Sequence, residues 1–216
     1  MTERPIICNG DMVRAILRGE KTQTRRPVKP IPVYPDAFDG LRREIHDGQA
    51  HFWACGAELP AHIFRCPYGH GDRLWVRETF REYYPKEGWP APKALYKADG
   101  IARLEDTETG KTIPWRPSIH MPRSLSRITL EITDINAERV QDITEDDARA
   151  EGVKPEFRTV VARSDGGPDY HIPCSYRGGF ANTWDAIYAK LSGLSWDEAP
   201  WVWAITFRRV ETSHEN

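Results

Sequence analysis

Two stretches in which apolar and polar residues alternate place the strongest constraint on the fold. In RITLEITDI (127–135), Ile128, Leu130 and Ile132 alternate with polar residues. In WVWAITF (201–207), every second residue is again large and apolar. A period of two is typical of a strand that buries one face. We therefore predict a long strand in each stretch, with one face of each strand turned toward the core.

Shorter patterns suggest the remaining elements. Helices are predicted at 12–17, 143–153 and 180–191, and further strands at 73–80, 94–98 and 111–115. The strand at 94–98 is expected to pair with the strand at 111–115. Strands separated by short helices, without a repeating strand–helix–strand rhythm, favour an α+β domain built on a small mixed or antiparallel barrel.

Helix ends are marked by specific residues. Asn9 or Asp11 can cap the first helix, and Gly19 can end it. In ITEDDARAEGV (143–153), Thr144 is the expected cap, Asp147 occupies the reciprocal capping position and Gly152 ends the helix. Glu151 then lies in the last turn of that helix.

Two polar segments rich in proline and glycine interrupt the pattern. We interpret residues 31–65 and 154–178 as insertions in a single domain that covers residues 1–210. The polar residues 211–216 are expected to form a disordered tail.

Composition narrows the class of protein. Hydrophobic residues make up 39% of the chain, so a packed core is expected, and the net charge of −2 gives no general attraction to nucleic acid. Because MTERPIICNG lacks the apolar run of a signal peptide and no apolar run is long enough to span a bilayer, we expect a cytoplasmic protein without a membrane partner. No oligomeric state is predicted.

Four residues could be interpreted as zinc ligands, namely Cys55, His62, Cys66 and His70. Their spacing contains no CxxC pair, which structural zinc sites commonly use. We therefore favour a turn in CPYGHGD (66–72), and we expect neither a metal nor an organic cofactor.

The segment RGEKTQTRRP (18–27) carries the most concentrated charge. Between positions 14 and 29, six basic residues face only Glu20. A solvated turn and an anion-binding loop are both compatible with this charge, although the glycines and preceding strand of a phosphate-binding P-loop are missing. A third interpretation is catalytic. Lys21 could act as a base toward the hydroxyl of Thr24 if burial and the cations Arg25 and Arg26 lower its pKa. Residues three apart in a regular strand point to opposite faces, so the chain would have to bend.

Two further places could contribute to a site. Glu151 lies at the negative end of a helix dipole, which favours its protonated form and would suit proton transfer; an exposed glutamate is the alternative. In RPSIHMPRS (116–124), two prolines bracket Ser118 and His120. That loop is either a stiff pocket wall or a connection before the long strand.

Taken in order, these motifs resemble an ASCH domain. The resemblance rests on ILRGEKTQTRR (16–26), GDRLWVRE (71–78), the long stretch at 127–153 and WVWAITF (201–207), and it covers most of residues 5–210. ASCH domains are PUA-like β-barrels related to RNA-binding PUA domains, and the whole chain is similar to the large ASCH proteins of phages and prophages. The resemblance implies this barrel for the present chain.

One branch of the family, the N4-acetylcytidine amidohydrolases, uses a lysine, a threonine and a glutamate in motifs that are similar to two segments here. Lys21, Thr24 and Arg26 match K-T-x-T-x-R, and ITEDDARAE (143–151) places Glu151 on the glutamate. The position of the family's alanine is shifted in this segment, and the present chain is much longer than those enzymes.

The resemblance implies catalytic roles for Lys21, Thr24 and Glu151, without a cofactor. Arg26 would steady the anionic intermediate. The remaining candidate substrate-binding residues are Arg25, Glu78, Ser118 and His120. The expected partner is a modified cytosine nucleoside or nucleic acid. A non-catalytic module that binds RNA or modified DNA, and a nuclease, are the alternatives, because a fold alone does not fix a reaction.

Overall fold

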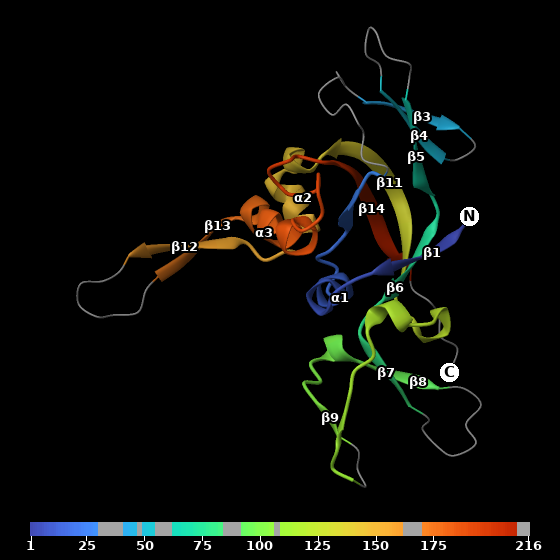
Figure 1. Ribbon diagram of the computed structural model, residues 1–216, viewed down its shortest axis with the longest axis vertical. Helices are drawn as coiled ribbons and strands as arrows, with labels where there is room; N and C mark the ends of the chain where they lie inside the picture. Colours follow the sequence, from blue (N-terminus) through green and yellow to red (C-terminus); the bar gives the residue numbers. More distant parts are fainter. Residues whose placement is uncertain are drawn as a thin grey trace. The chain divides into compact units, whose positions relative to one another are not determined.

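The computed structural model describes residues 1–29, 41–46, 49–54, 62–83, 92–105, 109–161 and 170–210, without the side chains of residues 41–65 and 158–174. The fold is α+β and is dominated by strands (Figure 1). The chain divides into two compact units. The first unit comprises Met1–Gly19, Gly71–Ile132 and Phe207–Asn216, and the second comprises Glu20–His70 and Thr133–Thr206.

The largest sheet has five strands. In sheet order they are β1 (Glu3–Ile7), β6 (Arg73–Arg77), β11 (Thr129–Arg139), β14 (Trp201–Val210) and β2 (Gln23–Pro27). β1 is parallel to β6, whereas β11 is antiparallel to β6 and β14 is antiparallel to β2. The sheet is therefore mixed. Since β1 and β2 end the order, the strands that the structure describes form an open sheet and not a closed barrel.

Both long strands predicted from alternation are present. Ile128, Leu130 and Ile132 are fully buried at β11, and Trp203, Ile205 and Phe207 are buried on β14. The alternation is incomplete, because Thr129 and Val202, which the pattern assigns to the other faces, are buried as well. Both faces of these strands are partly buried, which explains why exposed and buried residues do not alternate strictly there.

The three predicted helices are also present. They are α1 (Gly10–Leu17), α2 (Glu145–Ala150) and α3 (Tyr176–Tyr188). The side chain of Asn9 accepts a hydrogen bond from the Met12 N–H, and that of Thr144 accepts one from the Asp147 N–H, as expected of N-caps. Gly19 and Gly152 follow their helices with positive φ angles of 76° and 71°.

The apolar residues of the predicted helix 180–191 are only partly buried. Phe180 and Trp184 are buried in the core of the second unit, but Ile187 and Leu191 are exposed. This core contains residues from β14, α2, α3 and their neighbours, namely Val140, Ile143, Ala148, Phe180, Trp184 and Val202.

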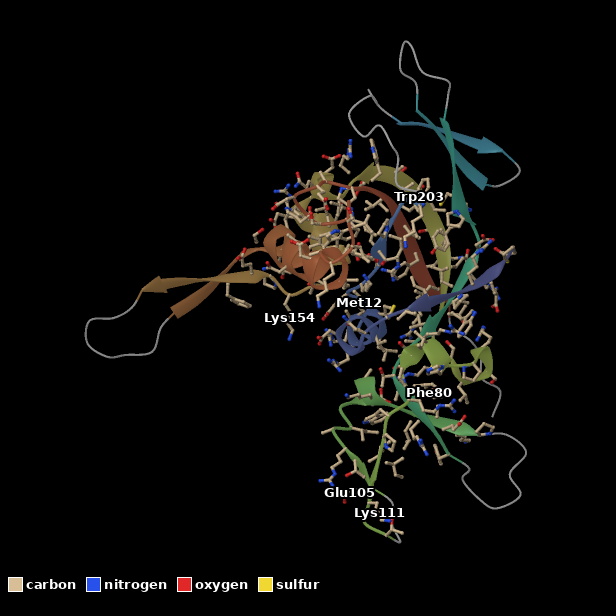
Figure 2. The ribbon with its side chains drawn as sticks, viewed as in Figure 1. Met12, Phe80, Glu105, Lys111, Lys154 and Trp203 are labelled. Atoms are coloured by element: carbon tan, nitrogen blue, oxygen red, sulfur yellow. The ribbon has the colours of Figure 1, made fainter. Side chains whose placement is uncertain are left out.

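The predicted pairing of 94–98 with 111–115 is wrong. β8 (Lys93–Tyr96) pairs with β7 (Phe80–Tyr83), and β10 (Thr112–Ile113) pairs with β9 (Leu104–Glu105). Each strand therefore pairs with the nearest preceding strand, in a local hairpin. Phe80, labelled in Figure 2, packs with Met121 and Leu125 in a small core of the first unit.

The two proposed insertions both contain strands. Within 31–65 and just beyond, β3 (Leu41–His46), β4 (Gln49–Ala54) and β5 (His62–Gly69) form an antiparallel sheet, and β12 (Glu156–Val161) pairs with β13 (Tyr170–Ser175). The turn expected over 66–72 is shorter than predicted, since β5 continues to Gly69 and only His70 and Gly71 turn. The proposed tail 211–216 lies outside the described residues.

Four short 3₁₀ helices complete the secondary structure: η1 (Lys97–Asp99), η2 (Ser118–His120), η3 (Arg123–Leu125) and η4 (Val140–Asp142). Within the part of the chain that the structure describes, no helix has the length and apolar character needed to cross a membrane.

Candidate active site

The segment that links α1 to β2 turns at Arg18 and Gly19 and then runs past the end of α2. The Thr22 N–H donates to the carbonyl of Ala150, the last residue of α2, at 2.8 Å. β2 begins only at Gln23, so Lys21 precedes the strand while Thr24 is part of it. The bond from Thr22 and the bonds of Lys21 to Glu151 hold this segment against the end of α2.

Lys21 is buried, with only 3% of its surface exposed, and all three of its N–H donors are used. Nζ donates to Oε2 of Glu151 at 2.7 Å, to the backbone carbonyl of Glu151 at 2.8 Å and to the carbonyl of Gln23 at 2.7 Å. Three donated bonds are the full capacity of an ammonium group. The bond to the carbonyl of Glu151 also places the Lys21 side chain at the C-terminal end of α2.

Glu151 has a cation on each carboxylate oxygen. Oε2 accepts from Lys21, and Oε1 lies 3.3 Å from Nη1 of Arg25. The residue is the C-cap of α2, and its N–H donates to the carbonyl of Asp147. The side chain is as deeply buried as that of Lys21, so the pair is screened from solvent and its charges interact strongly.

Arg25 lies at the centre of the charged group. Its Nε donates to Glu138 at 2.7 Å, its Nη2 lies 3.6 Å from Asp147, and its Nη1 also donates to Gln23 at 3.3 Å. The guanidinium lies 5.8 Å from the ring of Phe180, which packs over it. The expected solvated cation is therefore buried and surrounded by carboxylates of β11 and α2.

Thr24 is the most deeply buried member of the site, with 1% of its surface exposed. It pairs with Ile205 of β14 in the sheet. Its Oγ1 is buried without a hydrogen-bond partner. A buried hydroxyl without a partner destabilises a fold by about 1–3 kcal/mol, so it needs an explanation. Lys21 and Thr24 are thus not hydrogen-bonded to each other, although the catalytic interpretation needs a proton to pass between them.

The remaining predicted substrate contacts have other surroundings. Arg26 follows on β2, and its Nη1 donates to the carbonyl of Arg25 at 3.3 Å. Glu78 belongs to the first unit, as do Ser118 and His120, which form η2. Lys21 and Arg25 therefore each contact Glu151 directly. Glu78, Ser118 and His120 belong to the first unit.

Glu78 forms the centre of a separate network. Its two oxygens accept from Arg127 at 2.9 and 3.1 Å, and Arg127 also donates to both oxygens of Asp99. The guanidinium of Arg127 lies 3.9 Å from the centre of the Tyr96 ring. Burial raises the pKa of Glu78, while the bonds from Arg127 oppose that rise.

Sequence analysis missed Glu138 as a member of the charged group and recognised Asp147 only as a helix cap. Burial raises the pKa of Glu138, and Arg25 opposes that rise. The pKa of Asp147 is lowered: burial would raise it, but hydrogen bonds from Thr144 and Gln23 together with the charge of Arg25 prevail. Glu138 gave no local signal, because its partner Arg25 lies 113 residues away in the chain.

Among the residues that the structure describes, no three histidine, cysteine or acidic side chains are grouped as they would be around a metal ion. Of the four residues considered for zinc, Cys55 and the side chain of His62 lie outside the described part. Cys66 is buried and His70 is exposed.

The comparisons with known proteins add no relative. The chain matches no protein-family model, no curated protein and no solved structure. Fold and site therefore define an α+β protein with a buried lysine–glutamate pair.

Proposed function

We propose that this protein is an amidohydrolase that removes an acyl group from the exocyclic N4 amine of a cytosine nucleoside or related modified base. The observation that carries the proposal is the buried contact of Lys21 Nζ with Glu151 Oε2 at 2.7 Å, in a segment that also holds the buried residue Thr24. These residues come from the two segments that resemble the N4-acetylcytidine amidohydrolases of the ASCH family. The mixed α+β fold is compatible with that family. The PUA-like barrel of the family is part of what we propose for this chain.

The proposed chemistry begins with a proton transfer. Lys21 gives one proton to Glu151 across their short contact, which leaves a neutral amine. That amine accepts the proton of Thr24 as its oxygen attacks the amide carbonyl carbon. The C–N bond breaks, the departing amine takes the proton held by Glu151, and the acyl group stays on Thr24 as an ester. Water then hydrolyses this ester and restores the hydroxyl.

Burial of the site has two consequences for this reaction. Thr24 is buried, so a substrate reaches its hydroxyl only when the residues that cover it move. Exclusion of water then strengthens the electrostatic stabilisation of the intermediate. Arg25, which already contacts Glu151, joins Arg26 as a candidate for that stabilisation.

The test is direct incubation of purified protein with N4-acetylcytidine and its 2′-deoxy analogue, followed by chromatography of the products. We expect release of cytidine and deoxycytidine by the wild type, and loss of release in Lys21→Met, Thr24→Val and Glu151→Gln. Thr24→Ser keeps a hydroxyl and should retain part of the activity. A wild type that releases no more product than Lys21→Met on either substrate would refute the proposal.

One observation favours a second function. All three donors of Lys21 are occupied and its partners include a helix-capping carbonyl, which suits a structural cation better than a base. The second candidate is a non-catalytic module that binds RNA or modified DNA. Oligonucleotide binding that weakens with salt and persists in Thr24→Val and Glu151→Gln would support this module and oppose the hydrolase.

A further inference from the structure

Glu138 is the carboxylate that fixes the orientation of Arg25. It lies at the end of β11, and its Oε1 accepts from Arg25 Nε at 2.7 Å, the shortest of the contacts that Arg25 makes to a carboxylate. The side chain of Arg25 is 2% exposed and that of Glu138 is 26% exposed. Glu138 thus reaches from the edge of the site to its buried centre.

A fixed Nε determines where the rest of the guanidinium lies. The group is planar and rigid, so a bond to Nε sets the plane and the positions of both terminal nitrogens. Nη1 then meets Oε1 of Glu151 at 3.3 Å, and Nη2 lies 3.6 Å from Asp147. Gln23 strengthens this arrangement, because it donates to Asp147 at 3.0 Å and accepts from Arg25.

We propose that Glu138 is a positioning residue for Glu151, acting through Arg25. The inference rests on the proposed hydrolase function and names a residue that the resemblance does not. Glu138 itself touches neither Lys21 nor Glu151. The negative charge of Glu138 partly neutralises the positive charge of Arg25. The guanidinium therefore orients Glu151 but favours its charged form less strongly than an unshared cation would.

Removal of the charge of Glu138 should therefore impair the proton transfer. Arg25 would be left to Glu151 and Asp147, and the charged form of Glu151 would be favoured over the protonated form that the leaving amine requires. The charged groups that face Glu138 are Arg25 on β2, Asp147 on α2 and Asp142 on η4. Burial raises the pKa of Glu138, so acidic solution should imitate the loss of its charge.

The experiment compares Glu138→Gln with a matched control on the same strand. Glu131 also lies on β11, has a side chain 21% exposed and is paired with Arg208, away from Arg25. With N4-acetylcytidine as substrate, Glu138→Gln should lower kcat about 10- to 100-fold with little change in KM. Its acidic pH–rate limb should also move relative to that of the wild type. Glu131→Gln should change neither, and Glu138→Asp should recover part of kcat.

A second measurement does not depend on activity. Nitrogen-15 NMR of the folded, full-length protein follows the Arg25 Nε–H and the Lys21 ammonium protons, whose exchange with solvent should be faster in Glu138→Gln and unchanged in Glu131→Gln. Unchanged kcat and pH profile in a folded Glu138→Gln overturn the positioning role. If the wild type is inactive, the hydrolase proposal itself has failed. In that case, if the exchange of the Lys21 ammonium protons is the same in Glu138→Gln as in the wild type, the coupling of Glu138 to the Lys21–Glu151 pair through Arg25 is overturned as well. A changed exchange rate supports that coupling.

Discussion

At the scale of single residues, the polar groups of the site differ in whether they have hydrogen-bond partners. Lys21 uses all three of its donors and both carboxylate oxygens of Glu151 accept a bond, whereas the hydroxyl of Thr24 has no partner among the described residues. Buried polar atoms are usually paired, and those left unpaired often mark a function. The orphaned hydroxyl is therefore the group most informative about chemistry.

Thr24→Val tests this point through stability. Valine has nearly the shape of threonine, and it removes a buried hydroxyl that lacks a partner. We expect the free energy of unfolding to stay the same or rise by about 1 kcal/mol, because no hydrogen bond is lost. Urea denaturation of the wild type, Thr24→Val and Thr24→Ser measures the effect. A loss of stability in Thr24→Val would mean that the hydroxyl has a structural partner.

At the scale of elements, the start of α3 packs closely against the segment that enters β12. A Cβ on Gly179 would overlap the carbonyl oxygen of Lys154 and would approach the backbone nitrogen of Glu156 at 3.2 Å. A Cβ on the neighbouring Gly178 would meet chiefly the Glu156 side chain. The backbone cannot yield as readily as a side chain, so the two glycines are not equivalent. Lys154 is labelled in Figure 2.

This difference predicts opposite outcomes for two adjacent substitutions. Gly179→Ala should destabilise the protein by about 1–3 kcal/mol through overpacking. Gly178→Ala should be neutral or stabilise it by up to about 1 kcal/mol, because alanine favours the helix and Glu156 can move aside. Thermal unfolding of the two variants provides the comparison, and equal melting temperatures would contradict the close backbone contact.

Glu145 ties α2 to the beginning of α3. Its carboxylate accepts hydrogen bonds from the Ser175 hydroxyl and from the backbone N–H groups of Tyr176 and Arg177. The bond from Ser175, with the two backbone bonds, lowers the pKa of Glu145 from its ordinary value of 4.5. A lowered pKa contributes stability that is present above the unfolded value and is lost as pH falls through the folded value.

Glu145→Gln should therefore be less stable than the wild type at neutral pH. The difference between the two proteins should shrink as the pH falls below about 4.5. Asp146→Asn, which removes a neighbouring carboxylate without these bonds, serves as the control. Urea denaturation at a series of pH values measures the effect, and a difference that does not vary with pH would show that the charge of Glu145 contributes nothing.

At the scale of the whole molecule, local signals and distant contacts were predicted with unequal success. The cap at Thr144, the end at Gly152 and the alternation in β11 depend on residues near one another, and these predictions are confirmed. The burial of Arg25 depends on Glu138 and Glu151, more than a hundred residues away. No local pattern records such a partner, so the sequence did not predict the burial of Arg25. The pairing of β8 failed for a related reason, because strand patterns do not specify their partners.

The same long-range contacts determine which pieces of the chain can fold. The apolar cluster around Phe180 and Trp184 lies wholly within residues 133–206, yet three carboxylates of that segment find their cations in Lys21 and Arg25. Without them, Glu138, Asp147 and Glu151 would lose these cations, and for Glu151, whose side chain is 4% exposed, an uncompensated buried charge costs several kcal/mol. We therefore expect that this apolar cluster alone does not stabilise the fold of residues 133–206.

We predict that a fragment of residues 133–206 has no cooperative thermal transition by far-UV circular dichroism. Fusion of residues 20–29 to its N-terminus through a long glycine–serine linker restores β2 together with both cations, and should restore helical signal and a cooperative transition. The same fusion carrying Lys21→Met and Arg25→Met keeps the apolar strand residues but lacks the charges, and should behave like the unfused fragment. If the unfused fragment folded as well as the fusion, the apolar core alone would hold the second unit together. If the doubly substituted fusion folded, the strand would matter through its sheet pairing with β14, and the ion pairs would serve the chemistry of the site alone.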